Sequence, residues 1–166
     1  MILYLCYHGQ FLINMSSFGL SPIELLEYQP NRYPFLMIDR VTDVLPGSYA
    51  HGFKNLSMNE WYFPKHFPGH PNMPGALQLE AMAQMLTVAI TTMEGLKGCV
   101  THAIEHRVRF KREVVPGDCL FIKAELLSWK RGLARGRAVC TVDEIEVSNA
   151  DMTITIPELM TQYLPK

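Results

Sequence analysis

The chain reads PKHFPGHPNMP over residues 64–74 and continues without a break as GALQLEAMAQMLTVAI over residues 75–90. The first part contains four prolines, which fix their own φ angles and restrict the residues before them. His66 therefore lies on a stiff, pre-shaped loop. Such order costs chain entropy, and catalytic positioning is a common reason for it.

The second part predicts a buried helix, because its apolar residues leave almost no polar side. Pro74 suits the first helical position, where its missing N–H is no loss. Gly75 beside it lets another group approach the free N–H groups of the helix start. Glu80 is the one carboxylate in this stretch, and its burial is unfavourable unless it is hydrogen-bonded. Gln84 lies one turn later on the same face and is placed to hold it.

Each of these residues also has a plain interpretation. His66 alone could be a loop histidine without a chemical role, and Glu80 alone could pair with water or an arginine. Their combination with a glycine at a helix start offers a base, an acid and an oxyanion donor. That set raises the odds of an enzymatic site, and from the residues alone both interpretations stay open.

The run HFPGHPNMPGALQLEAMAQ resembles the signature of the (3R)-hydroxyacyl-acyl carrier protein dehydratases of the FabZ type. NRYPFLMIDRV at 31–41 and VRFKREVVPGD at 108–118 agree with the same family, and RGLARGRA at 131–138 is a weaker fourth match. The resemblance spans residues 21–155. It implies an α+β protein with the hot-dog fold, in which a curved antiparallel β-sheet wraps around a long central helix.

The resemblance also implies the chemistry. His66 is expected to act as the catalytic base at the α carbon of a thioester, and Glu80 as the acid or water-holder for the departing hydroxyl. The Gly75 N–H is expected to bind and polarise the substrate carbonyl, with Gln84 in support. Glu80 followed by AMAQ favours dehydration without double-bond isomerisation. The expected product is trans-2-enoyl-acyl carrier protein, in fatty acid or related lipid or polyketide biosynthesis.

Partners are implied in the same way. In the family, His66 and Glu80 would face each other from different subunits of a homodimer, and dimers can assemble further into a trimer of dimers. The formal net charge of −1 gives no reason to expect nucleic acid binding. Given the resemblance, two local basic stretches predict a docking surface for an acidic acyl carrier protein. The docking residues are Lys111, Arg112, Lys130, Arg131, Arg135 and Arg137.

The length supports one domain. We assign residues 1–20 to an N-terminal extension and residues 21–166 to a single hot-dog dehydratase domain. A short helix is expected over Pro22–Tyr28 with Ser21 as its N-cap, and Arg131-Gly132 is expected to form a hairpin turn. The β-rich patterns predict strands at Phe35–Asp43, Tyr49–Asn55, Val100–Lys111, Cys119–Trp129, Leu133–Asp143 and Glu146–Ile156.

Several classes of protein are disfavoured. The apolar start, MILYLCYHGQFLIN, lacks a basic n-region and a cleavage site and is interrupted well short of a membrane span; Met15 is an alternative start of the natural chain. We expect no membrane span and a cytoplasmic location. Four cysteines without CxxC spacing argue against structural zinc, and His102 and His106 lie in a predicted strand, so no metal is expected. No dinucleotide fingerprint indicates a cofactor.

The chain departs from the family pattern at four positions. Lys65 replaces the usual glycine before the histidine, and Asn31 replaces the histidine of the PHRYPFL motif. Ile104 lies near a family glycine, and Glu113 replaces the usual proline. The segment around Ile104 shapes the acyl tunnel in the family, so the preferred acyl chain stays open.

Three alternative functions share this fold. A hot-dog thioesterase would hydrolyse the thioester, but such enzymes generally place a carboxylate differently and lack HFPG paired with LEAMAQ. A non-catalytic acyl-binding or assembly subunit would lose the pair of His66 and Glu80. A dehydratase of a specialised secondary-metabolite pathway would keep the chemistry and change the acyl group.

Overall fold

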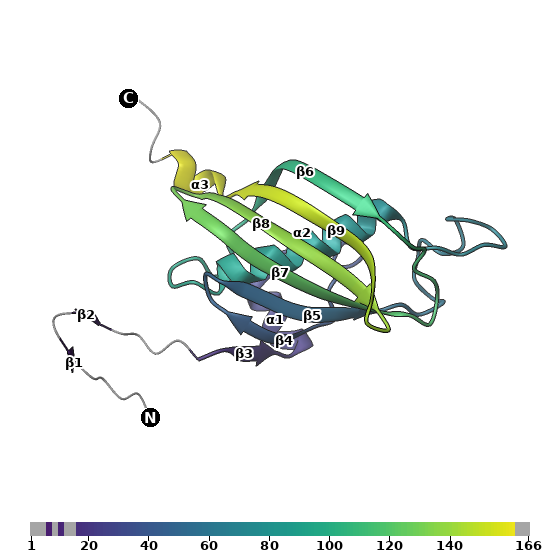
Figure 1. Cartoon of the computed structure of the whole chain (residues 1–166), viewed down its shortest axis with the longest axis horizontal. Coiled ribbons are helices and arrows are strands. Elements are labelled where there is room, and N and C mark those ends of the chain that lie inside the picture. Colours follow the sequence, from purple (N-terminus) through teal and green to yellow (C-terminus); the bar gives the residue numbers. More distant parts are fainter. Residues whose placement is uncertain (1–5, 8–9, 12–15, 162–166) are drawn as a thin grey trace.

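A curved sheet surrounds one long helix in the computed structural model, which describes residues 6–7, 10–11 and 16–161 (Figure 1). Seven strands pair antiparallel in the order β3-β4-β5-β7-β8-β9-β6. The described strands are β1 (Cys6–Tyr7) and β2 (Gln10–Phe11), which pair with each other, and β3 (Phe18–Leu20), β4 (Arg40–Leu45), β5 (Tyr49–Asn55), β6 (His102–Phe110), β7 (Cys119–Lys130), β8 (Leu133–Val142) and β9 (Ile145–Thr155). The helices are α1 (Pro22–Tyr28), α2 (Gly75–Thr91) and α3 (Pro157–Met160).

The core lies between α2 and the concave face of the sheet (Figure 1). Alternate residues of β5 and β8 are buried, as expected for strands with one face on a core. Gly52 and Gly136 let the helix approach closely, because a Cβ at either position would lie within 2.8 Å of Met85 or Leu86 side-chain atoms. The predicted α+β class, with a curved antiparallel sheet around a long central helix, is confirmed.

Both predicted helices are present. Ser21 caps α1 through a capping box, in which its side chain accepts from the Glu24 N–H and Glu24 accepts from the Ser21 N–H. The long helix begins at Gly75, with Pro74 as its N-cap residue. The predicted start at Pro74 is therefore wrong by one residue, because the extended backbone of Pro74, with ψ 134°, is not helical.

The predicted strand at Phe35–Asp43 is partly wrong, because the strand is Arg40–Leu45. The backbone before it bonds elsewhere: the N–H groups of Phe35 and Leu36 donate to the Arg32 carbonyl, and that of Met37 donates to a side chain of α2. Alternating apolar residues here reflect packing rather than sheet pairing. The other five predicted strands are confirmed to within two residues at each end.

Two tight turns shape the longest strands. Arg131 and Gly132 have φ 54° and 80°, which confirms the predicted hairpin turn, and Asp143 and Glu144 form a second one with φ 50° and 65°. Positive φ at both central residues is typical of turns that match the twist of paired strands. The second turn was not predicted, and neither were β3 and α3.

β3 falls within the segment that we assigned to an N-terminal extension, and it pairs with β4 at one edge of the sheet. Of the apolar start, residues 1–14, only residues 6–7 and 10–11 are among the described residues. Among the described residues, no helix has both the length and the apolar character required to cross a membrane.

Candidate active site

The loop that carries His66 is anchored on buried aromatic residues. Tyr62 and Phe63 are each 1% exposed, and the His66 N–H donates to the Tyr62 carbonyl at 2.9 Å. The Asn72 N–H returns to the His66 carbonyl at 2.8 Å, and the Met73 N–H donates to the Val114 carbonyl at 2.7 Å. Backbone hydrogen bonds therefore close the loop around His66 and tie its end to the segment before β7.

Two charged contacts brace the same loop. Glu60, near its start, accepts from the Lys54 Nζ at 2.7 Å, and Asp39 accepts from the same amine at 3.1 Å. Burial works against the charge of Lys54, but the hydrogen bonds and charges of Glu60 and Asp39 outweigh it and hold the pKa of Lys54 above its ordinary value. Farther along, the exposed His70 pairs with Glu113 at 3.0 Å.

The imidazole of His66 is oriented by a backbone group. Its Nδ1 lies 2.9 Å from the Asn72 carbonyl oxygen. A carbonyl can only accept, so Nδ1 donates, and in the neutral ring the lone pair is then on Nε2. The ring also stacks on Phe67, with 4.0 Å between the centroids. This tautomer is the one that a general base acting through Nε2 requires.

Glu80 lies in the first half of α2, and its carboxylate is held by side chains. Oε1 accepts from the Gln84 Nε2 at 2.7 Å and from the Asn31 Nδ2 at 3.1 Å. No hydrogen bond to Oε2 is found within the described part of the chain. Two donors on one oxygen fix the direction of the carboxyl group and leave the other oxygen available.

Both the Nε2 and the Oε1 of Gln84 form hydrogen bonds in this arrangement. In addition to Glu80, its Nε2 donates to the Phe35 carbonyl at 2.5 Å, and its Oε1 accepts from the Met37 N–H at 2.8 Å. The residue is 3% exposed. Gln84 therefore joins the helix that carries Glu80 to the irregular segment before β4.

A small cavity of about 90 Å³ adjoins Glu80, Asn31 and Thr87, and Ile154 of β9 contributes to its wall. This volume is large enough for water and too small for a fatty acyl chain. The monomer thus offers Glu80 room for a departing water molecule but not for a whole substrate.

A second, larger pocket lies at the start of α2, where Gly75 meets the end of β6. A Cβ at Gly75 would lie 2.7 Å from the Phe110 ring, so the glycine is required for this close approach. Neither backbone nor side-chain partners are found for the Gly75 N–H among the described residues, as expected at a helix start. The pocket is lined by Asn72, Met73, Gly75, Ala76, Gln78, Phe110, Lys111, Arg112 and Glu113.

His66 and Glu80 share no hydrogen bond and no pocket among the described residues. The roles assigned to His66, Glu80, Gly75 and Gln84 from sequence stay predictions. The geometry brings Gln84 to Glu80 through the 2.7 Å hydrogen bond.

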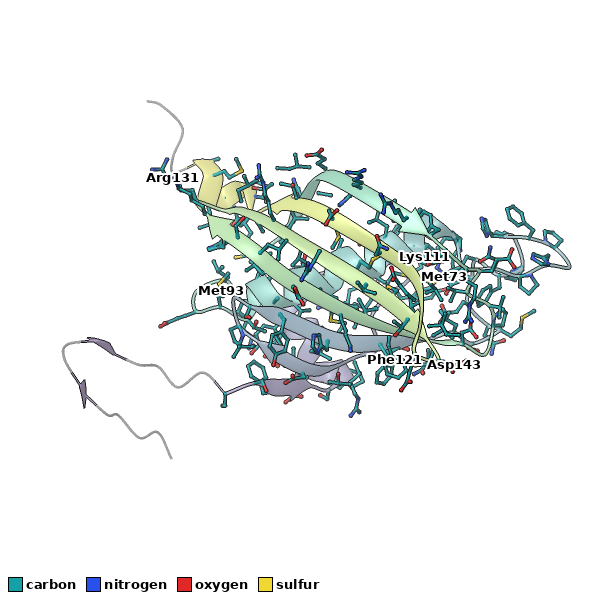
Figure 2. All side chains as sticks on the ribbon, in the orientation of Figure 1. Met73, Met93, Lys111, Phe121, Arg131 and Asp143 are labelled. Atoms are coloured by element: carbon teal, nitrogen blue, oxygen red, sulfur yellow. The ribbon has the colours of Figure 1, made fainter. Side chains whose placement is uncertain are left out.

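The predicted docking residues divide into two groups. Figure 2 shows Lys111 beside the helix start and Arg131 at the opposite end of the sheet. Lys111 pairs with Glu146 at 2.8 Å, and Arg137 pairs with Glu125 at 2.7 Å. Lys111 and Arg131 are therefore far apart, whereas the middle of the sheet brings the two basic stretches together, because Arg107 and Arg135 line one hollow.

Sequence reasoning missed four residues that the site uses. Asn31 was noted only as a departure from the family, and Asn72, Gln78 and Phe110 were not singled out. The single signal was the position of Asn72 inside the proline-rich loop. The contacts of Asn31 and Phe110 cross 49 and 35 positions of sequence, and no local pattern reports such contacts.

Comparison with known proteins identifies the family. Residues 29–151 match the model of the FabA-like domain. The chain is 42% identical over 143 residues to a "3-hydroxyacyl-[acyl-carrier-protein] dehydratase FabZ" of Syntrophomonas wolfei, covering 86% of this chain and 99% of that protein. It is 45% identical over 126 residues to the protein of the same name from Acetivibrio thermocellus, covering 75% and 86%.

Solved structures agree on the fold. The dehydratase heterocomplex ApeI:P of Xenorhabdus doucetiae matches with a TM-score of 0.70 at 17% identity, covering 86% of this chain and 97% of the other. A hypothetical thioesterase of Streptococcus pneumoniae matches with a TM-score of 0.51 at 16% identity, covering 67% and 84%. At such identities the likeness concerns the fold alone. The sequence matches are the more specific finding, and by them this chain belongs to the FabA-like family, among its FabZ-type members.

Proposed function

We propose that this protein is a hydro-lyase that dehydrates (3R)-3-hydroxyacyl-acyl carrier protein to trans-2-enoyl-acyl carrier protein in fatty acid biosynthesis. The observation that carries the proposal is the 42% identity to a FabZ dehydratase over 99% of that protein's length. The orientation of His66 and the held carboxylate of Glu80 support it. The acyl chain length is left to experiment.

In the proposed reaction, His66 accepts a proton and Glu80 donates one. His66 Nε2 takes a proton from C2, the electron pair forms the C2–C3 double bond, and the C3–O bond breaks. A proton on Oε2 of Glu80 completes the departing water, and transfer of the proton from His66 to Glu80 restores the site. The Gly75 N–H would stabilise the negative charge that develops on the thioester carbonyl.

We further propose that each site is completed by a second copy of the chain. No hydrogen bond joins His66 and Glu80 among the described residues, and β6 exposes most of both faces at an edge of the sheet. Unpaired edge strands of this kind readily add another strand. His66 of one subunit would then act with Glu80 of the partner subunit. Three such dimers would form the hexamer that the family resemblance implies, and mass measurement in solution distinguishes the two assemblies.

For carrier docking, Lys111 and Arg112 are favoured by their place at the pocket beside Gly75. The proposed surface keeps a second group, which comprises Lys130, Arg131, Arg135 and Arg137. Charge reversal at Lys111 and Arg112 should raise KM for the acidic carrier and leave turnover of a small pantetheine thioester unchanged. Charge reversal at Lys130 and Arg135 tests the second group in the same way.

The expected cytoplasmic location also remains a prediction.

Turnover of 3-hydroxyacyl carrier thioesters of several lengths tests the function, with conjugated enoyl product and free thiol measured separately. We expect enoyl product from the wild type and a loss of about 100-fold or more in His66→Ala and in Glu80→Ala. Free thiol without enoyl product would identify a thioesterase instead.

Mixing the two inactive variants tests the shared site. If one dimer combines Glu80 of the first variant with His66 of the second, one intact site forms and part of the activity returns. No recovery, with subunit exchange demonstrated, would locate the site within one chain.

A further inference from the structure

Gln78 holds a buried acceptor that nothing in the described residues satisfies. The residue is 3% exposed, and its Nε2 donates to the Met73 carbonyl at 3.3 Å. Its Oε1 is fully buried and has no hydrogen-bond partner among the described residues. Such groups are rare in folded proteins, because leaving one unpaired is costly.

The position of this acceptor indicates what would pair with it. Gln78 lines the pocket at the start of α2 together with Gly75 and Phe110. Gly75 and Gln78 are three positions apart, and therefore lie on one face of the helix about one turn from each other. The pocket thus offers an N–H donor at Gly75 and a carbonyl acceptor at Gln78, whose amide is turned back toward the helix start by its bond to the Met73 carbonyl.

We propose that Gln78 Oε1 accepts the amide N–H nearest the sulfur of the carrier's phosphopantetheine arm. This inference rests on the proposed function, since it assumes a carrier-bound thioester whose carbonyl binds the Gly75 N–H. In such a thioester, a sulfur and two carbons separate the carbonyl carbon from the amide nitrogen. The amide N–H therefore follows the carbonyl closely enough for both groups to bind in the one pocket that Gly75 and Gln78 line.

Other donors on the substrate fit less well. The 3-hydroxyl has to reach Glu80, and Glu80 faces a different cavity from Gln78. Two positions of helix turn the side chain by about 200°, so one hydroxyl cannot serve both. The acyl chain itself carries no further donor. Exposed Lys111 and Arg112 lie at the same pocket and would face the phosphate end of the arm.

The test compares two arms that differ at a single group. One substrate is the 3-hydroxyacyl thioester of pantetheine, and the other has an ester oxygen in place of the amide N–H nearest the sulfur. We expect the wild type to prefer the amide by about tenfold in kcat/KM, because the ester leaves Gln78 unpaired. Most of the difference should lie in KM, as for an interaction made equally in the ground state and transition state.

Gln78→Met removes the acceptor with little change in length and should bring the amide-to-ester ratio close to one. Equal use of both arms by the wild type would overturn the proposal and indicate an ordered water at Oε1. A ratio that persists in Gln78→Met would assign the amide to another acceptor. The wild-type ratio decides the matter even if the variant folds poorly, as its thermal unfolding would reveal.

Binding separates this proposal from the proposed function. Butyryl thioesters of both arms lack the 3-hydroxyl and cannot be dehydrated, so calorimetry reports the same tenfold preference without turnover. One outcome is that binding prefers the amide but neither 3-hydroxyacyl thioester gives enoyl product. That outcome would overturn the proposed dehydratase activity and keep the proposed role of Gln78. Enoyl product without any preference between the two arms would support the dehydratase and overturn the proposed role of Gln78.

Discussion

The loop that carries His66 and the helix that carries Glu80 hold their side chains by different means. His66 is fixed by backbone groups, through the Tyr62 carbonyl and both the N–H and the carbonyl of Asn72. Glu80 is fixed by the side chains of Gln84 and Asn31. Side-chain substitutions near Glu80 should therefore impair the site, whereas those near His66 should matter only when they alter the backbone.

The largest effect is expected at Gln84. Gln84→Met leaves the Met37 N–H and the Phe35 carbonyl without a partner and removes a donor from Glu80. We expect a loss of about 2–4 kcal/mol in the free energy of unfolding, from unpaired buried groups, and about 100-fold in turnover. Urea unfolding and enoyl formation measure the two effects.

Thr91→Val provides the matched control for Gln84→Met. Thr91 is buried in the same helix, and its hydroxyl donates to the Thr87 carbonyl at 3.0 Å. The control should retain activity. An active, fully stable Gln84→Met would contradict the assigned network.

A smaller effect is expected at Asn31. Asn31→Ala removes the second donor to Glu80 and should lower kcat about tenfold, which is typical for the loss of one hydrogen bond. Asn31→Asp should lower kcat further, because a second carboxylate beside Glu80 disfavours the negative charge that Glu80 acquires when it donates its proton. Steady-state kinetics of both variants decide this, and equal activity of wild type and Asn31→Ala would remove Asn31 from the site.

Gly75→Ala tests the contact between the helix start and β6. The added methyl would overlap the Phe110 ring, which can move because it is 49% exposed. We expect about a fivefold loss in kcat/KM and a small change in stability. Phe110→Leu should restore part of the activity in the double variant, and a double variant no better than Gly75→Ala would exclude steric conflict as the cause.

The smallest effect is expected at Asn72. Its side chain accepts only a long bond from the Val114 N–H, at 3.4 Å, whereas its contacts with His66 use the backbone. Asn72→Ala should therefore stay within about twofold of wild-type activity. Asn72→Pro removes the N–H that donates to the His66 carbonyl and should lose far more. Similar activity of the two variants would contradict backbone control of His66.

Local features of the fold were predictable. The capping box at Ser21 and the turn at Arg131-Gly132 depend on neighbouring residues, and the burial of α2 follows from its own composition. The segment from Phe35 to Met37 was misassigned to a strand, because its N–H groups donate to Arg32 and to the distant Gln84. Backbone pairing with β5 begins only at Asp39, whose N–H donates to the Phe53 carbonyl. An alternation of apolar residues indicates which side chains are buried, but it does not indicate which groups the backbone hydrogen-bonds to.

The sequence by itself determined the residue types of the candidate site, the stiff loop around His66, the buried helix with its single carboxylate and the family. These depend on composition and spacing within a few turns of chain. Only the tertiary structure decided that Asn31 reaches Glu80 and that Phe110 covers Gly75. It also decided that Gln78 holds an acceptor unpaired among the described residues, and that Lys111 and Arg131 lie at opposite ends of the sheet (Figure 2). Each of these depends on how distant segments pack around α2, and sequence spacing does not encode those distances.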